Sequence, residues 1–308
     1  KKRAQKPAKK PARGKKMTNR ADYSKHSACL AAIFIIGDAV ITLPDLYYGG
    51  AILPGFFIAA AFSVAVYFLS LLLCRGLLQG GIFKKILLVL FLLSAAVYAF
   101  WNGAHCVLDF LSFADKILLP GGEHFAVAFI FLFTAAVLSV KKNDVILKLS
   151  LIIAPFFILA VIIFFLLTAK NFEFENIALH SMPTFTELKN GTAPFLFGTA
   201  LPAVLIPPYF MLTNAKPREG AGLWGLLAGL VITVLILCDS VLLFGGRMAA
   251  RLPFPLAAAV STVTVGPLFT RMDGIVYCLF FISALIKTAF CARLCYMAIK
   301  RIKFISFQ

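Results

Sequence analysis

The chain has 308 residues, of which 61% are hydrophobic and 14% charged, and its mean hydropathy is +0.93. Soluble domains contain roughly 45–50% apolar and about 25% charged residues, so the composition excludes an ordinary cytoplasmic enzyme, a disordered chain and a disulfide-stapled secreted domain. The formal net charge is +17. We therefore expect an all-α polytopic membrane protein.

The first segment is strongly basic. Residues 1–16 contain nine Lys or Arg and no acidic residue, together with Pro and Gly. Like charges, Pro and Gly oppose folding, so residues 1–20 are predicted to form a disordered cytoplasmic tail near anionic lipid rather than a nucleic-acid-binding arm. A transmembrane domain is expected over 21–303, followed by a short C-terminal end, 304–308.

The rest of the chain contains apolar segments of about the length that a membrane span needs. The fourth is short, and the third and eighth are long enough to be tilted. The eight predicted spans are 28–46, 53–74, 83–113, 125–140, 146–168, 193–213, 221–245 and 272–299.

The distribution of basic residues predicts the orientation. With the N-terminus in the cytoplasm, the inner segments contain 14 Lys or Arg and the outer segments 6, even without the basic residues of 1–16. Cytoplasmic connections carry such an excess. We therefore expect both termini to be cytoplasmic.

Two spans carry residues that disturb helices. Span 1 has Gly37 and Asp38 in its middle and Pro44 near its outer end, while span 6 has Gly198 and then Pro202. Because Pro202 has no N–H to donate to the Gly198 carbonyl, we expect span 6 to open around Gly198, Thr199 and Ala200. Backbone groups freed in hydrocarbon need a neighbour, water or a ligand. Breaks at the first and sixth positions are typical of inverted-repeat transporters, which bind substrate there.

Three charged residues lie deep in spans: Asp38, Asp239 in span 7 and Lys287 in span 8. Asp38 could bind a substrate amine, coordinate a cation, take up a proton, or bond the broken backbone as a neutral group. Lys287 could be a built-in cation or a proton carrier. Pairing with Asp38 or Asp239 is the favoured interpretation of Lys287.

Span 3 carries a polar stripe. Tyr98, Asn102, His105 and Asp109 follow one another at spacings of four, three and four residues, and Trp101 lies beside them. This spacing places them on one helix face, as the wall of a cavity or as helix–helix contacts. His105 and Asp109 could form a proton-sensitive pair.

Motifs for catalysis, nucleotides or metals are absent from the sequence. There is no GxxxxGK[ST], GxSxG or HExxH, so neither an enzyme nor a cofactor is predicted. Cys291 and Cys295 are one helical turn apart, but no second ligand pair follows, and packing is the favoured role. Gly222, Gly225 and Gly229 have the spacing of close helix packing.

Three stretches carry a resemblance to a family. They are IFIIGDAVITLP (33–44), ENIALHSMPTFTELKNGTAPFLFGTALPAVLIPPYFML (175–212) and FTRMDGIVYCLFFISALIKTAFC (269–291). In these stretches the chain resembles the permease-like B subunit of spore nutrient germinant receptors, a branch of the amino acid–polyamine–organocation transporter superfamily. The resemblance covers about 20–303.

The resemblance implies a transporter-like inverted-repeat fold, for which the family has ten spans where eight are predicted here. It implies a small nutrient ligand, typically an amino acid, and A-type and C-type receptor subunits as partners in the inner membrane of a spore. By position, the ligand site would fall on the first-helix and sixth-helix breaks and on the wall of span 3. These residues are Gly37, Asp38, Ala39, Gly198, Thr199, Ala200, Pro202, Tyr98, Trp101 and Asn102.

Two functions are therefore expected. The first is a sensor that binds a nutrient like a transporter and signals germination to its partners. The second is a proton- or cation-coupled amino acid transporter, for which Asp38, Asp239 and Lys287, with the pair His105 and Asp109, are the ion or proton candidates.

Overall fold

The structure is a computed structural model, and every regular element in its described part is helical. This confirms the predicted all-α class. The basic tail, residues 1–19, lies outside the described residues. The described residues are 20–42, 52–77, 82–118, 122, 124–141, 144–177, 184–213, 217–218, 220–249, 251–252, 254–262 and 273–306.

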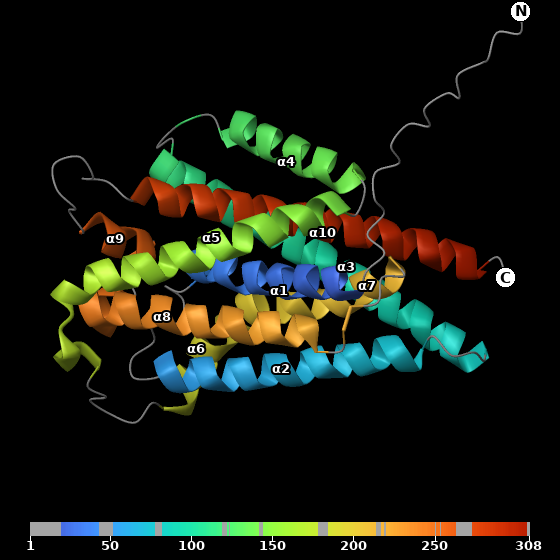
Figure 1. The fold of residues 1–308 in the computed structure, drawn as a ribbon, viewed down its shortest axis with the longest axis horizontal. Helices are drawn as coiled ribbons and strands as arrows, with labels where there is room; N and C mark the ends of the chain where they lie inside the picture. Colours follow the sequence, from blue (N-terminus) through green and yellow to red (C-terminus); the bar gives the residue numbers. More distant parts are fainter. Residues whose placement is uncertain are drawn as a thin grey trace, which may run out of the picture.

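The helices follow one another along the chain and pack as one elongated bundle (Figure 1). Five short segments of the described chain have π or 3-10 geometry. η3 follows α3, η4 and η5 lie after α5, and η6 and η7 join α6 to α7. The elements are α1 (Arg20–Thr42), α2 (Ile52–Gly76), α3 (Ile82–Phe113), η3 (Ala114–Leu118), α4 (His124–Val140), α5 (Asp144–Thr168), η4 (Ala169–Asn171), η5 (Phe174–Ile177), α6 (Phe185–Pro194), η6 (Phe195–Ala200), η7 (Leu201–Leu205), α7 (Ile206–Leu212), α8 (Ala221–Ala249), α9 (Pro255–Ser261) and α10 (Asp273–Ser306).

Six helical segments of the described chain are long and apolar enough to cross a membrane. They correspond to the second, third, fifth, sixth, seventh and eighth predicted spans. The first predicted span is α1, which begins eight residues earlier than expected, at Arg20. The fourth is α4, which has 17 residues. A polytopic helical membrane protein is therefore supported, whereas the full set of eight spans stays a prediction.

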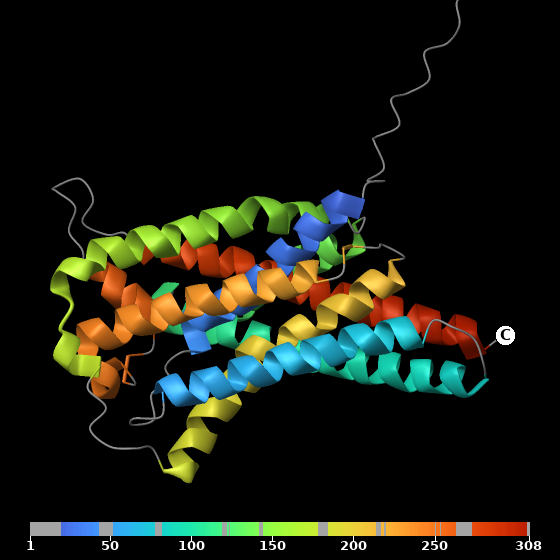
Figure 2. The ribbon, with the colours of Figure 1, turned by 60° about the horizontal axis from the view of Figure 1, so that its bottom comes forward.

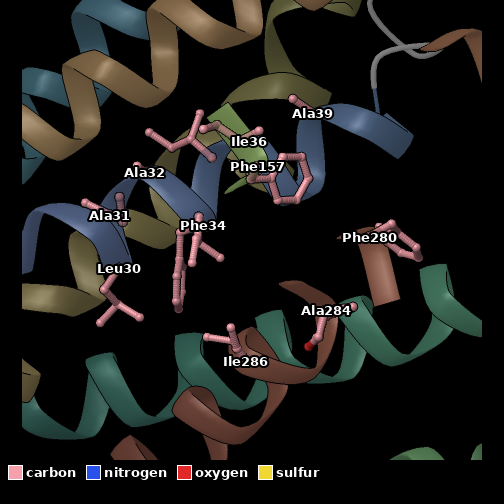
Figure 3. Close-up of a cluster of buried hydrophobic side chains, with 14 of the residues drawn as sticks. Leu30, Ala31, Ala32, Phe34, Ile36, Ala39, Phe157, Phe280, Ala284 and Ile286 are labelled. Carbon is pink, nitrogen blue, oxygen red and sulfur yellow. The ribbon is translucent and has the colours of Figure 1, made fainter. Parts of the chain in front are cut away.

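Helix α1 lies inside the bundle and contacts α5, α8 and α10. Every residue from 30 to 37 is buried. In Figure 3, Phe34 and Ala39 of α1 lie with Phe157 of α5 and with Ala284 and Ile286 of α10. A helix that is apolar on all sides belongs in a core rather than at a surface, which explains why the first helix of the chain is enclosed by later ones.

Helices α1 and α8 approach each other closely through the predicted small-residue positions. A Cβ atom added to Gly225 would overlap the backbone of Ala28, and one added to Gly229 would lie 3.0 Å from the Cβ atom of Ile35. Glycine removes the side chain that would hold two membrane helices apart. The close-packing interpretation of these glycines is thus confirmed.

The second close pair is α3 with α10. The Sγ atom of Cys106 donates to the Ala284 carbonyl at 3.5 Å, and that of Cys295 donates to the Ala96 carbonyl at 3.2 Å. A Cβ atom on Gly103 would lie 3.1 Å from the Cβ atom of Cys291. Cys291 and Cys295 therefore pack α10 against α3, as small residues do.

The outer faces of the bundle are apolar. Large apolar side chains are exposed along α2, α3, α4 and α5, for example Phe62, Leu90, Phe133 and Leu159. Soluble monomers rarely expose such continuous apolar faces, but lipid tails cover them at no cost. The bundle is accordingly that of an integral membrane protein.

The C-terminal end of α8 contains a sharp bend that the sequence pattern did not reveal. Gly245 has φ of 70°, which only glycine adopts readily, and the helix changes direction there. The Leu242 carbonyl accepts the N–H of Glu173 at 3.0 Å and the amide of Asn176 at 3.1 Å. The connection after α5 is thereby attached to α8. The short buried helix α9, which follows the bend, was not predicted.

Candidate functional site

Span 6 changes helix type in its middle. α6 runs into the π-helical η6 (Phe195–Ala200), which is followed directly by the 3-10 helix η7 (Leu201–Leu205) and then by α7. A π-turn is wider and a 3-10 turn is tighter than an α-turn, and mid-helix changes of this kind mark functional or strained segments. The chain thus stays helical where an opening at Gly198, Thr199 and Ala200 was predicted, but its helical geometry changes there.

Prolines explain which backbone groups are released. In an α-helix the carbonyl of residue i accepts the N–H of residue i+4, so Pro202 deprives the Gly198 carbonyl of its donor and Pro208 deprives that of Val204. The Lys287 ammonium group donates to the Gly198 carbonyl at 3.4 Å, and the Ser70 hydroxyl donates to the Val204 carbonyl at 3.2 Å. Both released carbonyls are therefore satisfied by side chains of other helices, α10 and α2.

A third donor reaches the same segment from α3. The Tyr98 hydroxyl donates to the carbonyl of Phe197, which directly precedes Gly198, at 3.2 Å. Tyr98 also stacks on Trp101, with ring centroids 6.0 Å apart and an interplanar angle of 23°. Two successive carbonyls of η6 thus bond to two different helices, and the exposed rings of Trp101 and Phe197 lie at the margin of this region.

Lys287 is the charged centre of the region. Its side chain is 4% exposed, and its ammonium nitrogen lies 6.0 Å from the centroid of the Phe34 ring on α1. A carbonyl oxygen and the face of an aromatic ring both favour a cation. Helices α1 and α10 and the segment η6 therefore meet around the buried amino group of Lys287.

The predicted break in span 1 is wrong for the described residues, because α1 stays α-helical through Gly37 to Thr42. A Cβ atom on Gly37 would lie 2.6 Å from the Oγ atom of Ser283 on α10. Gly37 thus serves close packing and not a break. Ala39 is buried, whereas the side chain of Asp38, and Pro44 as a whole, lie outside the described residues. The roles proposed for Asp38 remain predictions.

The other predicted residues of span 6 are placed as follows. Thr199 and Pro202 are buried, beside Gly198 and the Lys287 contact. The side chain of Ala200 lies outside the described residues. Segment η6 contacts both α1 and α2. Of the predicted site, the structure therefore brings together Gly198, Thr199, Tyr98 and Trp101.

The rest of the span 3 stripe consists of Asn102, His105 and Asp109, of which His105 touches this group through Trp101. Asn102 is buried at the α3–α10 contact, with its Oδ1 atom 4.0 Å from the Sγ atom of Cys291. His105 is exposed, and its ring lies 4.6 Å from that of Trp101. Asp109 is partly buried. The stripe thus follows the border between the buried and the exposed faces of α3.

The predicted alternative pair of Lys287 with Asp239 is not formed. The Asp239 side chain is 1% exposed and accepts a hydrogen bond from the Thr168 hydroxyl at the end of α5. Its second oxygen has no hydrogen-bond partner in the described part of the chain. Asp239 belongs to the α5–α8 contact through this hydrogen bond. A pair of Lys287 with Asp38 stays a prediction.

Sequence reasoning missed three contributors: Phe34, Ser70 and Ser283. Pro208 does signal that the Val204 carbonyl needs a donor, but Ser70 lies in an apolar run with no feature that identifies it as that donor. Phe34 precedes Gly37 by one helical turn and could have been placed on the same side of α1. Nothing in the sequence pattern distinguishes Ser283.

Comparison of the chain with protein-family models, with curated proteins and with solved structures gives no match.

Proposed function

We propose that this membrane protein binds a small nutrient, with an amino acid as the first candidate, at the interrupted middle of span 6. The observation that carries the proposal is the pair of successive carbonyls, those of Phe197 and Gly198, that bond to Tyr98 of α3 and to Lys287 of α10. Interrupted membrane helices are tolerated where they line a binding region or are buried in protein.

The chemistry of these contacts supports a polar ligand. An ammonium group or a hydroxyl of a ligand donates to carbonyl oxygens in the same way as Lys287 and Tyr98 do, and each carbonyl oxygen has two lone pairs. A ligand carboxylate would in turn accept from the Lys287 ammonium group. An amino acid carries both groups, so it can share or replace the donors that now hold η6 to α3 and α10.

Exchange of these donors would link binding to movement. η6 is connected to α3 through Tyr98 and to α10 through Lys287, and it contacts α1 and α2. A ligand that binds better when these helices are rearranged shifts the population toward that arrangement. The proposed role is a sensor that passes this shift to partner subunits.

The biological setting that we propose rests on the family resemblance. The sequence stretches around α1, span 6 and α10 resemble the B subunit of spore germinant receptors. On this proposal the chain is a permease-like subunit of the spore inner membrane, with both termini cytoplasmic and with A-type and C-type subunits as partners. Signalling germination would be its output, and it would perform no catalytic step.

A binding measurement tests the ligand site. The purified full chain in lipid nanodiscs would be heated with panels of amino acids, sugars and nucleosides, since a ligand that binds only the folded state raises the melting temperature. Gly198→Leu should abolish the shift. Gly76→Leu is the matched control, because a Cβ atom there meets nothing within 4 Å. A normal shift in Gly198→Leu would exclude the site.

Deletion of the gene from spores tests the setting. Loss of the germination response to one nutrient class, restored by the gene but not by the Gly198→Leu variant, is the expected result. An unchanged response to every nutrient would contradict the sensor role. Asp38→Asn should weaken the response if Asp38 contributes a charge to the site.

The second candidate is a coupled amino acid transporter. The buried ionisable groups Lys287 and Asp239 within spans favour it. Uptake into proteoliposomes under an imposed proton or cation gradient separates the two functions. Binding without uptake supports the sensor, whereas gradient-dependent uptake that Lys287→Met abolishes supports the transporter.

A further inference from the structure

One end of the bundle is a distinct structural unit. There, the last turns of α2, the first turns of α3 and the last turns of α10 lie together beyond the centre of the molecule (Figure 2). Their apolar contacts form a small cluster separate from the main core. Its buried members are Leu77, Leu88, Leu92, Ala96 and Ala298. We call this unit the basic end.

The charges of the basic end have one sign. Its described segments, 71–77, 82–92 and 296–306, contain basic residues and neither Asp nor Glu. All of the basic side chains are exposed. They are Arg75, Lys84, Lys85, Lys300, Arg301 and Lys303. Three helix ends that are distant in sequence thus present their cations together.

Exposed apolar side chains alternate with these cations. On α3, Phe83 is 77% and Ile86 56% exposed, and Lys84 and Lys85 lie between them. On α10, Phe304 is 55% exposed and lies beside Arg301, whose guanidinium carbon is 5.8 Å from the ring centroid. Such a mixture suits neither water nor the hydrocarbon core. It suits the membrane interface, where aromatic rings sit at headgroup level and long basic side chains reach toward the headgroups.

Helix length places this end at the interface. α10 has 34 residues, which at about 1.5 Å per residue gives roughly 51 Å, against a hydrocarbon core of about 30 Å. The exposed basic residues Lys300, Arg301 and Lys303 lie in the last two turns of α10. Because α10 is longer than the hydrocarbon core is thick, at least one of its ends passes into the headgroup layer, and the end that carries Lys300, Arg301 and Lys303 suits that layer.

We propose that the basic end is a docking surface for anionic phospholipid headgroups. Lys84 and Lys85 of α3 and Lys300, Arg301 and Lys303 of α10 supply the cations for lipid phosphates, and Phe83, Ile86 and Phe304 insert beside the acyl chains. Clusters of Lys and Arg next to a spanning helix bind anionic lipid in this way. The surface differs from the tail of residues 1–16, and it does not depend on the proposed ligand site.

The lipid is favoured over an acidic protein by the apolar side chains. The first turn of α3 is exposed all round, with Phe83, Lys84, Lys85 and Ile86 all open. A protein partner would cover one side and leave the remaining apolar surface in water. Lipid surrounds the helix end completely.

The test measures lipid binding to the full chain. The protein in phosphatidylcholine nanodiscs would be titrated with phosphatidylglycerol, and the apparent affinity followed by melting temperature and by native mass spectrometry. Lys300→Gln, Arg301→Gln and Lys303→Gln together should weaken phosphatidylglycerol binding about a hundredfold. Each cation near an anionic surface contributes about a fivefold gain in affinity, and the three gains multiply. The matched control replaces the exposed Lys116, Lys170 and Lys189, which belong to η3, η4 and α6, and should leave the affinity unchanged.

Further arms identify the source of the anionic group. Lys300→Arg with Lys303→Arg keeps the charge and should keep the binding. Inorganic phosphate at the same phosphate concentration should not compete, because it lacks acyl chains; competition would indicate a site for free phosphate. Equal loss in the triple variant and in its matched control, or phosphatidylglycerol binding that the triple variant retains, would overturn the proposal.

Discussion

Spans 1 and 6 contain similar glycines in their middles, yet among the described residues of the two spans only those of span 6 leave the α-helical geometry. Around Gly37, α1 keeps its helix and packs against Ser283. Around Gly198, the chain changes from π to 3-10 geometry. The difference between the two is Pro202, which has no N–H for the carbonyl four residues earlier. The missing donor alone does not decide the outcome, because α5 stays α-helical around Pro155; in span 6 it is combined with Gly198.

The two spans also differ in what holds them in place. α1 is fixed by close contacts on all sides, with glycines of α8 against its backbone. Span 6 is also packed, with Phe195 and Tyr209 fully buried. In addition, its carbonyls accept hydrogen bonds from Tyr98, Lys287 and Ser70. Packing is hard to change without loss of the fold, whereas hydrogen bonds can be exchanged for those of a ligand. Mutations in the two spans can test this contrast.

The largest effect is expected at the α1–α8 contact. Gly225→Leu places a side chain where the backbone of Ala28 lies, and backbone cannot move aside. Overpacking of this kind costs about 3 kcal/mol or more. Chemical unfolding in mixed micelles would measure the loss, with Gly76→Leu as the control. Near-normal stability of Gly225→Leu would show that α1 is not fixed by packing.

A somewhat smaller effect is expected at Lys287. Lys287→Met keeps the volume but removes the donor to the Gly198 carbonyl, and a buried acceptor left without a partner costs about 1–3 kcal/mol. Pro202→Ala then supplies an N–H to the same carbonyl and should recover about 1 kcal/mol in the Lys287→Met background. A double-mutant cycle on the free energy of unfolding measures this coupling. Strictly additive effects would contradict the assignment of the break to Pro202.

The next effect concerns Gly37. The Cβ atom of Gly37→Ala would meet the Ser283 side chain at 2.6 Å from its Oγ atom, and overpacking costs about 1–3 kcal/mol. Ser283→Gly removes the obstructing atoms, so the double variant should recover most of the loss. If Gly37→Ala is instead stabilising on its own, the glycine does not serve this contact.

The smallest effect is expected at Ser70. Ser70→Ala removes the donor to the Val204 carbonyl, which corresponds to about 1 kcal/mol. Ser70→Thr retains a hydroxyl and should lose less. The same unfolding assay applies, and Ser94→Ala is a control because Ser94 bonds within its own helix, to Phe91. If Ser70→Ala and Ser94→Ala lower the free energy of unfolding equally, the Ser70 hydroxyl does not specifically stabilise span 6.

The sequence was sufficient for the six long apolar helices of the described chain and for the location of the irregular segment around Gly198, because hydropathy and the missing N–H of Pro202 act locally. It did not predict α9. It was insufficient for α1, since its continuity depends on α5, α8 and α10 surrounding it. It was also insufficient for the partner of Lys287. Asp239 and Lys287 are equally deep in their spans, but which helix faces η6 is decided by packing. Tyr98 could be placed near the site from its position in span 3 and from the resemblance. Ser70 could not, because its contact with span 6 depends on packing.

The enclosed position of α1 has a consequence for biosynthesis. α1 is synthesised before its main neighbours α5, α8 and α10, which follow it in the chain. Until α5, α8 and α10 are synthesised, α1 lacks the contacts that stabilise it, and such long-range contacts form slowly. Substitutions that prevent α8 or α10 from packing should therefore leave α1 exposed to quality-control proteases.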